Sequence, residues 1–103
     1  MAMLDYERHR QTLTVRLANE LDHSAAAQLR GELDDLLRDG TIRRLVLDLR
    51  RLSFMDSSGI GLIIGRYKLM ERRGGSVAVM NADRRMDRIF EMSGLYELVE
   101  RMA

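Results

Sequence analysis

The run Leu45–Leu49 constrains the fold more than any other part of the sequence, because it is apolar almost throughout. Such a run is typical of a strand that is covered on both faces or lies centrally in a sheet. A second apolar run, residues 77–80, follows it after one helical pattern. Two buried strands joined by a helix run parallel through a right-handed crossover. The sequence therefore predicts an α/β fold with a parallel core.

A hairpin is expected before this core. Residues 12–17 alternate, with Leu13, Val15 and Leu17 on one face, and this pattern predicts a half-buried strand. Residues 5–9 are expected to be its antiparallel partner, with a turn at residues 10–11. The sheet is therefore predicted to be mixed.

Three helices are expected between and after the strands. Asp22 and Ser24 are favourable caps for the first, which we expect to end at a left-handed Gly40. The second is expected to open near Ser57 and to stop at Gly74-Gly75. Its predicted apolar face consists of Ile60, Ile63, Ile64 and Tyr67.

Less regular segments complete the prediction. We expect a polar loop over residues 50–56, a third helix capped by Asn81 and closed by Gly94, and a last short strand at residues 98–99. Gly61 and Gly65 lie four residues apart on the second helix. Since glycine costs about 1 kcal/mol of helix propensity, close packing against a neighbour is the expected reason for them.

Composition excludes several classes of function. The 103 residues predict a single domain over 1–103, and 46% hydrophobic residues predict a packed core. The 17 basic and 16 acidic residues argue against a nucleic-acid partner, and the arginine pairs are interpreted as solvated ends of elements. The absence of cysteine and the presence of only two histidines, His9 and His23, argue against a metal or other cofactor.

Targeting signals are also missing from the sequence. No apolar stretch approaches the roughly 20 residues that cross a bilayer, and the first residues lack the pattern of a signal peptide. We therefore expect a cytoplasmic protein that does not bind membranes.

Residues 53–61 carry the most informative chemistry. Asp56, Ser57 and Ser58 stand where a buried strand gives way to a helix, so unpaired N–H groups and the positive end of the helix dipole lie beside them. Gly59 is expected to allow close approach from outside. Spacing alone leaves two interpretations open: an ordinary helix cap, or an exposed hydroxyl at the sheet edge where α/β proteins bind ligands.

Known enzyme motifs do not fit this segment. No lysine follows a glycine as a phosphate-binding loop requires, and Gly59-Ile60-Gly61 lacks the third glycine of a dinucleotide site. The nucleophile elbow fails because its first glycine is missing. A triad of Ser58, His23 and Asp22 fails because a histidine is poorly placed to be oriented by the adjacent aspartate. The chain is therefore predicted not to be an enzyme.

The segment from Leu49 to Tyr67, with Leu-Ser-Phe-Met-Asp-Ser-Ser-Gly-Ile-Gly and Gly-Arg-Tyr-Lys, closely resembles the STAS domain of anti-sigma factor antagonists. Glu20-Leu21-Asp22-His23 and Phe90-Glu91-Met92-Ser93-Gly94-Leu95 match as well. Within the family, the chain is most similar to the sporulation branch, the anti-sigma F factor antagonists. The resemblance implies a single STAS domain with a mixed β-sheet and helices packed against it.

The resemblance also implies a switch. The unphosphorylated protein would bind an anti-sigma factor with serine kinase activity, and so release a sigma factor. The kinase would then phosphorylate Ser58, and a serine phosphatase would reset the protein. The docking surface would comprise Asp22, His23, Asp56, Ser57, Ser58, Gly59 and Gly61.

The switch needs no refolding. A phosphate adds about −1.5 to −2 charges at a helix start, which the dipole tolerates and an acidic partner surface does not. We expect a monomer. The alternatives are a STAS-type module that binds a nucleotide or other anion, or a scaffold of the stressosome or lipid-transport type.

Overall fold

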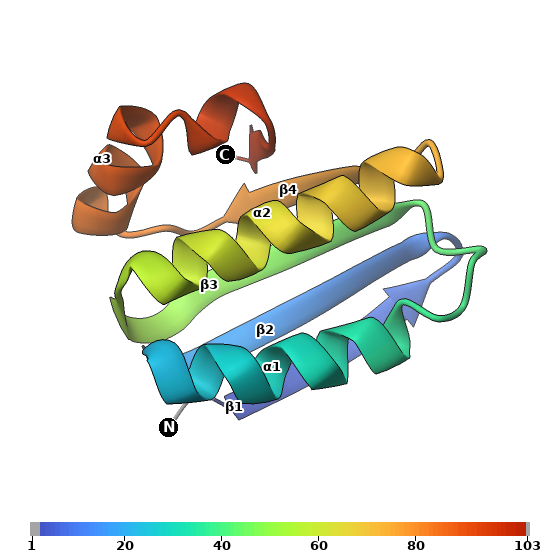
Figure 1. Ribbon diagram of the computed structural model, residues 1–103, viewed down its shortest axis with the longest axis horizontal. Coiled ribbons are helices and arrows are strands. Elements are labelled where there is room, and N and C mark those ends of the chain that lie inside the picture. The colour runs from blue at the N-terminus through green and yellow to red at the C-terminus, as the bar shows by residue number, and fades with distance from the viewer. Residues whose placement is uncertain (1–2, 103) are drawn as a thin grey trace.

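The computed structural model describes residues 3–102, and these form one α/β domain. The chain begins with a hairpin and continues with helices that alternate with strands (Figure 1). The elements in chain order are β1 (Met3–His9), β2 (Thr12–Leu21), α1 (His23–Leu36), β3 (Arg44–Met55), α2 (Ser57–Arg72), β4 (Ser76–Met80), α3 (Arg84–Met92), the 3₁₀ turn η1 (Leu95–Glu97) and β5 (Glu100–Met102).

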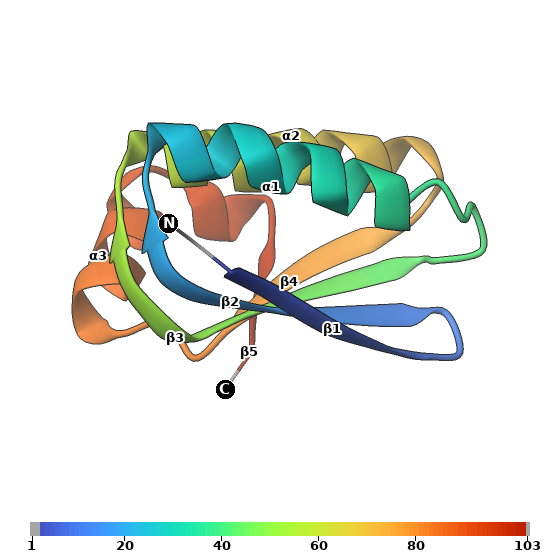
Figure 2. The same cartoon turned by 90° about the horizontal axis from the view of Figure 1, so that it is seen from below.

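The five strands form one sheet in the order β1-β2-β3-β4-β5. β1 is antiparallel to β2, and every later pair is parallel. The prediction of a mixed sheet is therefore confirmed. Figure 2 shows α1 and α2 side by side on one face of the sheet, with α3 beyond one end of it. Right-handed crossovers between successive neighbouring strands place both helices on the same face.

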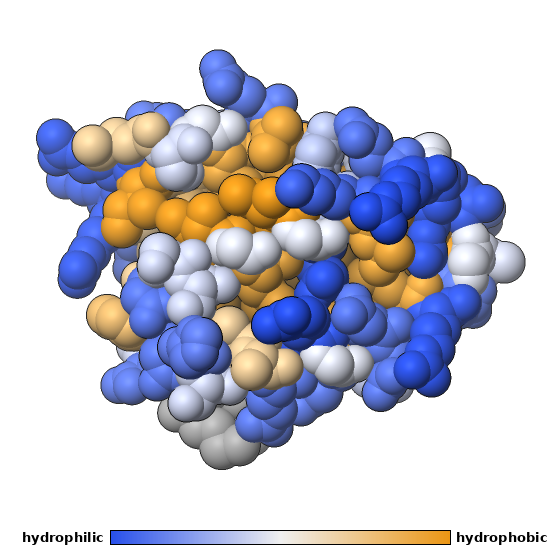
Figure 3. Space-filling view, viewed as in Figure 1, coloured by the Kyte–Doolittle hydropathy of each residue, from blue (hydrophilic) through white to orange (hydrophobic). Residues whose placement is uncertain are grey.

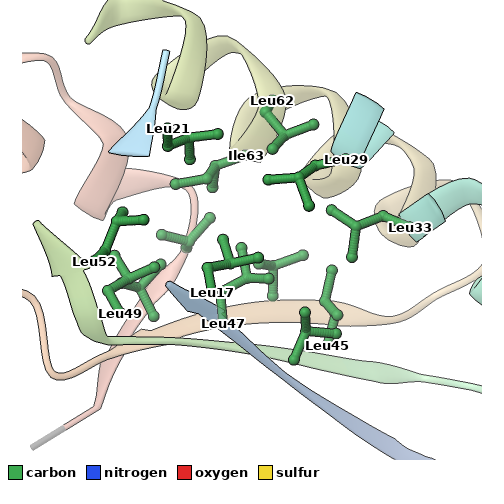
Figure 4. Packing of buried hydrophobic residues seen from close by; sticks show 14 of the residues in the cluster. Leu17, Leu21, Leu29, Leu33, Leu45, Leu47, Leu49, Leu52, Leu62 and Ile63 are labelled. Atoms are coloured by element: carbon green, nitrogen blue, oxygen red, sulfur yellow. The ribbon is translucent and has the colours of Figure 1, made fainter. Parts of the chain in front are cut away.

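The core fills the space between this helical layer and the sheet (Figure 4). The alternating residues Leu13, Val15 and Leu17 of β2 are all at most 1% exposed, as the sequence pattern predicted. They meet Leu29 and Leu33 from α1. Burial of these large side chains stabilises the domain, at about 1.5–3 kcal/mol for each one that is fully buried.

β3 is longer than predicted, because residues 50–55 belong to the strand and not to a loop. Two register shifts against β2, at Arg16/Ala18 and Asn19/Glu20, place extra residues in β3. Such bulges re-aim side chains, so Leu49 and Leu52 are both buried although they are three residues apart. Arg50 and Arg51 between them stay exposed, which is why the segment looked like a loop.

Several helix ends also differ from the prediction. α1 ends at Leu36 with Leu37 as its C-cap, and Gly40 does not adopt a positive φ. α3 is capped by Asp83, whose carboxylate accepts a hydrogen bond from Met86 N at 2.8 Å, and not by Asn81. The last strand begins at Glu100, two residues later than expected.

The glycines at two turns behave as predicted. Gly74 follows α2 with φ of 73°, and Gly94 follows α3 with φ of 80°. Both values lie in the left-handed region, which glycine adopts at little cost. These residues therefore end the two helices sharply.

Candidate functional site

The starts of α1 and α2 lie next to each other at one edge of the sheet. β2 and β3 are parallel and end together, with Leu21 paired with Met55. The amide of Asp56 donates a hydrogen bond to the carbonyl of Leu21 at 3.3 Å, which ties the second helix start to the end of β2. Two segments that are far apart in the sequence therefore form one surface.

An aspartate caps each of these helices. Asp22 accepts a hydrogen bond from Ala25 N at 2.9 Å, and Asp56 accepts one from Ser58 N at 2.8 Å. Each carboxylate satisfies an N–H group that has no partner within the helix, and each lies at the positive end of a helix dipole. Asp22 was expected to cap the first helix, and this is confirmed. For the second helix the sequence left the cap open, and the structure assigns it to Asp56.

The two serines of the motif face different sides of α2. Ser57 is exposed and lines a hollow toward α3. Ser58 is half-buried and lines a groove toward α1. Its Oγ lies 3.4 Å from Nδ1 of His23, at the first position of α1. The structure therefore gives these adjacent hydroxyls distinct surroundings.

The groove between α1 and α2 has a volume of about 330 Å³. Small residues keep it open on both sides, because Ala26 and Ala27 line it from α1 and Gly61 and Gly65 from α2. A Cβ atom added at either glycine would meet no other atom within 4 Å. The prediction that these glycines serve close helix packing is therefore wrong: they leave the surface hollow.

Two arginines line the groove beyond Ser58. Arg66 is only 8% exposed, and its Nε lies 3.3 Å from a carboxylate oxygen of Asp34. Burial lowers the pKa of Arg66 below its usual value, while the charge of Asp34 opposes this shift. Arg30 on α1 lines the same groove, and its charge also lowers the pKa of Arg66.

An apolar hollow of about 140 Å³ lies on the other side of the motif. It is formed where the first turn of α2 faces α3, and its lining residues are Met55, Asp56, Ser57, Ile60, Met86, Ile89 and Phe90. Figure 3 shows apolar surface gathered along α2, with hydrophilic side chains around it. Ser57 and Ser58 thus lie between an apolar surface and a basic groove.

Gly59 does not have the surface role that was predicted for it. It is buried, and an added Cβ would lie 2.4 Å from Cγ of Met55 and 3.0 Å from a methyl carbon of Leu21. Glycine at this position lets the first turn of α2 pack directly against the strand ends. The close packing of Gly59 therefore fixes the position of the first turn of α2, which carries Ser57 and Ser58.

The structure brings most of the predicted site residues together. Asp22, His23, Asp56, Ser57 and Ser58 meet at the edge described above, and Gly61 lines the groove. The sequence reasoning missed Arg30 and Arg66. Their spacing was a usable signal, since Arg30 lies seven residues after His23 and Arg66 eight after Ser58, each on the same helix face.

The same geometry bears on catalysis. The carboxylate of Asp22 accepts a hydrogen bond from Ala25 N, at the cap of α1. The catalytic triad requires an aspartate that is hydrogen bonded to the histidine and fixes its orientation.

Among residues 3–102, no group of three or more acidic, histidine or cysteine side chains is arranged to hold a metal ion. None of the helices described is long and apolar enough to cross a membrane.

Comparison with known proteins identifies the family. The family model that describes the STAS domain matches residues 3–103 of this chain. The chain belongs to the STAS domain family. The predicted resemblance is thereby confirmed. This STAS domain is 41% identical over 96 residues to an anti-sigma F factor antagonist of Paenibacillus polymyxa, a match that covers 93% of the chain and 82% of the relative. It is 31% identical to an anti-sigma-B factor antagonist of Bacillus subtilis, a match that covers 94% of this chain and 87% of the relative.

Solved structures agree with these relatives. The STAS domain superimposes on the unphosphorylated form of the anti-sigma factor antagonist SpoIIAA with a TM-score of 0.80 and 31% identity, covering 98% of this chain and 88% of that one. For the phosphorylated form of SpoIIAA from Bacillus, the TM-score is 0.78 at 33% identity. This match covers 98% of this chain and 92% of that one. The fold of this chain is therefore similar to both forms of that protein.

Proposed function

We propose that this chain is an anti-sigma factor antagonist of the sporulation branch, a regulatory protein and not an enzyme. In this proposal, the unphosphorylated chain binds an anti-sigma factor that is also a serine kinase, and the sigma factor is released. The relatives named as anti-sigma F and anti-sigma-B factor antagonists support it, as does the likeness to SpoIIAA. The process belongs to the cytoplasm, where bacterial transcription takes place.

Ser58 is the proposed site of phosphorylation. The observation that carries this assignment is the position of its hydroxyl, at the first turn of α2 and 3.4 Å from His23. A phosphate there lies at the positive end of the helix dipole, which stabilises an anion by about 0.3–1 kcal/mol. The fold tolerates the modification for this reason. A relative of the same fold, SpoIIAA, has a phosphorylated form.

The proposed docking surface surrounds Ser58. Asp22, His23, Asp56 and Ser57 would contact the partner at the sheet edge, and Gly61 would do so along α2. The apolar hollow beside Ser57 adds surface of the kind that interface centres bury, while the groove with Arg30 gives the opposite side a basic character. A partner that is complementary to both sides would cover Ser58.

Phosphorylation would release this partner through charge and steric conflict. A phosphate with two charges, placed about 7 Å from one carboxylate of the partner, costs roughly 1 kcal/mol in water and about 5 kcal/mol at an effective dielectric constant of 20. The corresponding loss of affinity is about tenfold to a thousandfold. No change of fold is required. A serine phosphatase would return the protein to its binding form.

Incubation with the partner kinase and ATP, followed by mass spectrometry, tests the proposal. We expect the mass of one phosphate on the wild type and on Ser57→Ala, and no added mass on Ser58→Ala. The adjacent Ser57 serves as the matched control, because it shares the helix turn but faces the other side. Phosphate on Ser57, or none on either serine, would overturn the assignment of Ser58.

A binding measurement completes the test. Unphosphorylated protein should bind the kinase, and phosphorylated protein should bind at least tenfold more weakly. Equal binding of the two forms would contradict the switch even if Ser58 is modified.

A further inference from the structure

His23 is placed to interact with whatever is attached to Ser58. It is exposed and begins α1, and its Nδ1 lies 3.4 Å from the hydroxyl oxygen of Ser58. In the unmodified protein this is a long contact. A phosphoryl group on Oγ brings three further oxygens to this position, together with most of two negative charges.

Charged groups of both signs surround His23 and Ser58. The carboxylates of Asp22 and Asp56 lie at the two helix starts, and each already accepts a hydrogen bond from a backbone amide. On the groove side, Arg30 of α1 and Arg66 of α2 are the basic residues that line the same hollow as His23 and Ser58. Asp34, which pairs with Arg66, lies farther along α1. A phosphate that points into the groove therefore contacts His23 first. Arg30 and Arg66 lie farther along the same groove, and their positive charges attract it.

We infer that His23 holds the phosphoryl group of Ser58 within the molecule, and takes up a proton as it does so. The inference rests on the proposed phosphorylation of Ser58. Transfer of the γ-phosphoryl group of ATP forms the Oγ–P bond, breaks the bond to ADP and releases the hydroxyl proton; His23 takes its proton from solvent. The imidazolium then donates a charge-assisted hydrogen bond to a phosphate oxygen, of the kind that is about 2.7–2.9 Å long.

This contact links the two helix starts in the phosphorylated form alone. An opposite charge within hydrogen-bond distance favours the charged form of an imidazole, so phosphorylation raises the pKa of His23. A higher pKa increases the fraction of the imidazole that is protonated at neutral pH. The phosphorylated protein thus neutralises part of its new charge by itself and fixes the orientation of the phosphate.

A pair of NMR titrations tests the inference. Phosphoserine is installed at position 58 during synthesis, so that the sample does not depend on a kinase. His9 is an internal control, because it pairs with Thr12 at the opposite end of β2 from His23. We expect the pKa of His23 to rise by about one unit or more on phosphorylation, while that of His9 changes by less than about 0.2 units. An unchanged pKa of His23, or equal shifts of both histidines, would overturn the inference.

The phosphate itself gives a second readout. In ³¹P NMR, the second pKa of phosphoserine, ordinarily about 6, should be lower in the wild type than in the His23→Gln variant. Equal phosphate pKa values in the two proteins would count against the contact. Because both titrations use installed phosphoserine, they can fail while the kinase still modifies Ser58, or succeed while it does not. The inference and the proposed function are therefore tested separately.

Discussion

Replacing Gly59 with alanine should destabilise the protein, although alanine is the better helix former. A Cβ at this position would lie 2.4 Å from Cγ and 2.9 Å from Sδ of Met55, and 3.0 Å from a methyl carbon of Leu21. Leu21 is fully buried, so it has little room to move. Overpacking of this kind costs about 1–3 kcal/mol. The gain in helix propensity, at most about 1 kcal/mol, offsets only part of it.

Gly61→Ala is the matched control, two residues farther along the same helix. A Cβ at Gly61 meets no atom within 4 Å, so the propensity gain of up to about 1 kcal/mol should appear as increased stability. Because Gly61 lines the groove, the same variant should bind the proposed partner more weakly than the wild type.

Urea denaturation of the three proteins measures both effects. We expect the free energy of unfolding to rank Gly61→Ala above the wild type, and the wild type above Gly59→Ala by about 1–2 kcal/mol. In a domain of this size, 1 kcal/mol corresponds to about 4–8 °C in Tm. A Gly59→Ala protein that is as stable as the wild type would refute the packing argument, because Met55 and Leu21 would then have yielded without cost.

Three further changes probe other parts of the structure. Asp56→Ala removes the cap of α2 and leaves Ser58 N without its acceptor, which should cost about 1 kcal/mol in urea denaturation; Asp56→Asn should retain most of that stability. Hydrogen bonds from the hydroxyl and amide of Thr41, and then from Arg8, hold the pKa of Asp39 well below its ordinary value of 3.8. The ionised carboxylate of Asp39 therefore stabilises the fold above pH 3.8. This stabilisation is lost as the pH falls through the pKa of Asp39 in the folded protein. Asp39→Ala should therefore be less stable than the wild type at pH 7, and the difference in unfolding free energy should shrink below pH 3.8; a constant difference would contradict the assignment. Arg66→Met should change stability by less than Asp34→Ala does, because the second change leaves a buried guanidinium without its carboxylate; the reverse order of their melting temperatures would be the contrary result.

The sequence alone was enough to predict the main architecture and the sheet edge at which Ser57 and Ser58 lie. The apolar run at Leu45–Leu49 predicts a central or doubly covered strand, and β3 is the central strand of the sheet. The alternation in β2 predicts a half-buried strand, and its inward residues belong to the core. Parallel pairing of β2 with β3 then places the residues after Leu21 beside those after Met55. The proximity of His23 to Ser58 follows from these two features.

Other features depend on packing that the local sequence does not encode. Arg50 and Arg51 look like a loop because both are exposed, yet register shifts keep them within β3. Small residues on a helix suit either a close contact or an open groove, and only the positions of the neighbouring side chains decide between the two for Gly61. The burial of Arg66 likewise depends on Asp34 of the other helix, which no pattern within α2 reveals.

The surroundings of Ser58 come from segments that are 35 positions apart, and this has a consequence for quality control. A short peptide with the sequence around Ser58 lacks His23, the end of β2 and the groove. An enzyme that recognises this edge would accept only chains that have already paired β2 with β3. Misfolded copies would then escape modification, so the state of Ser58 would report on folded molecules alone.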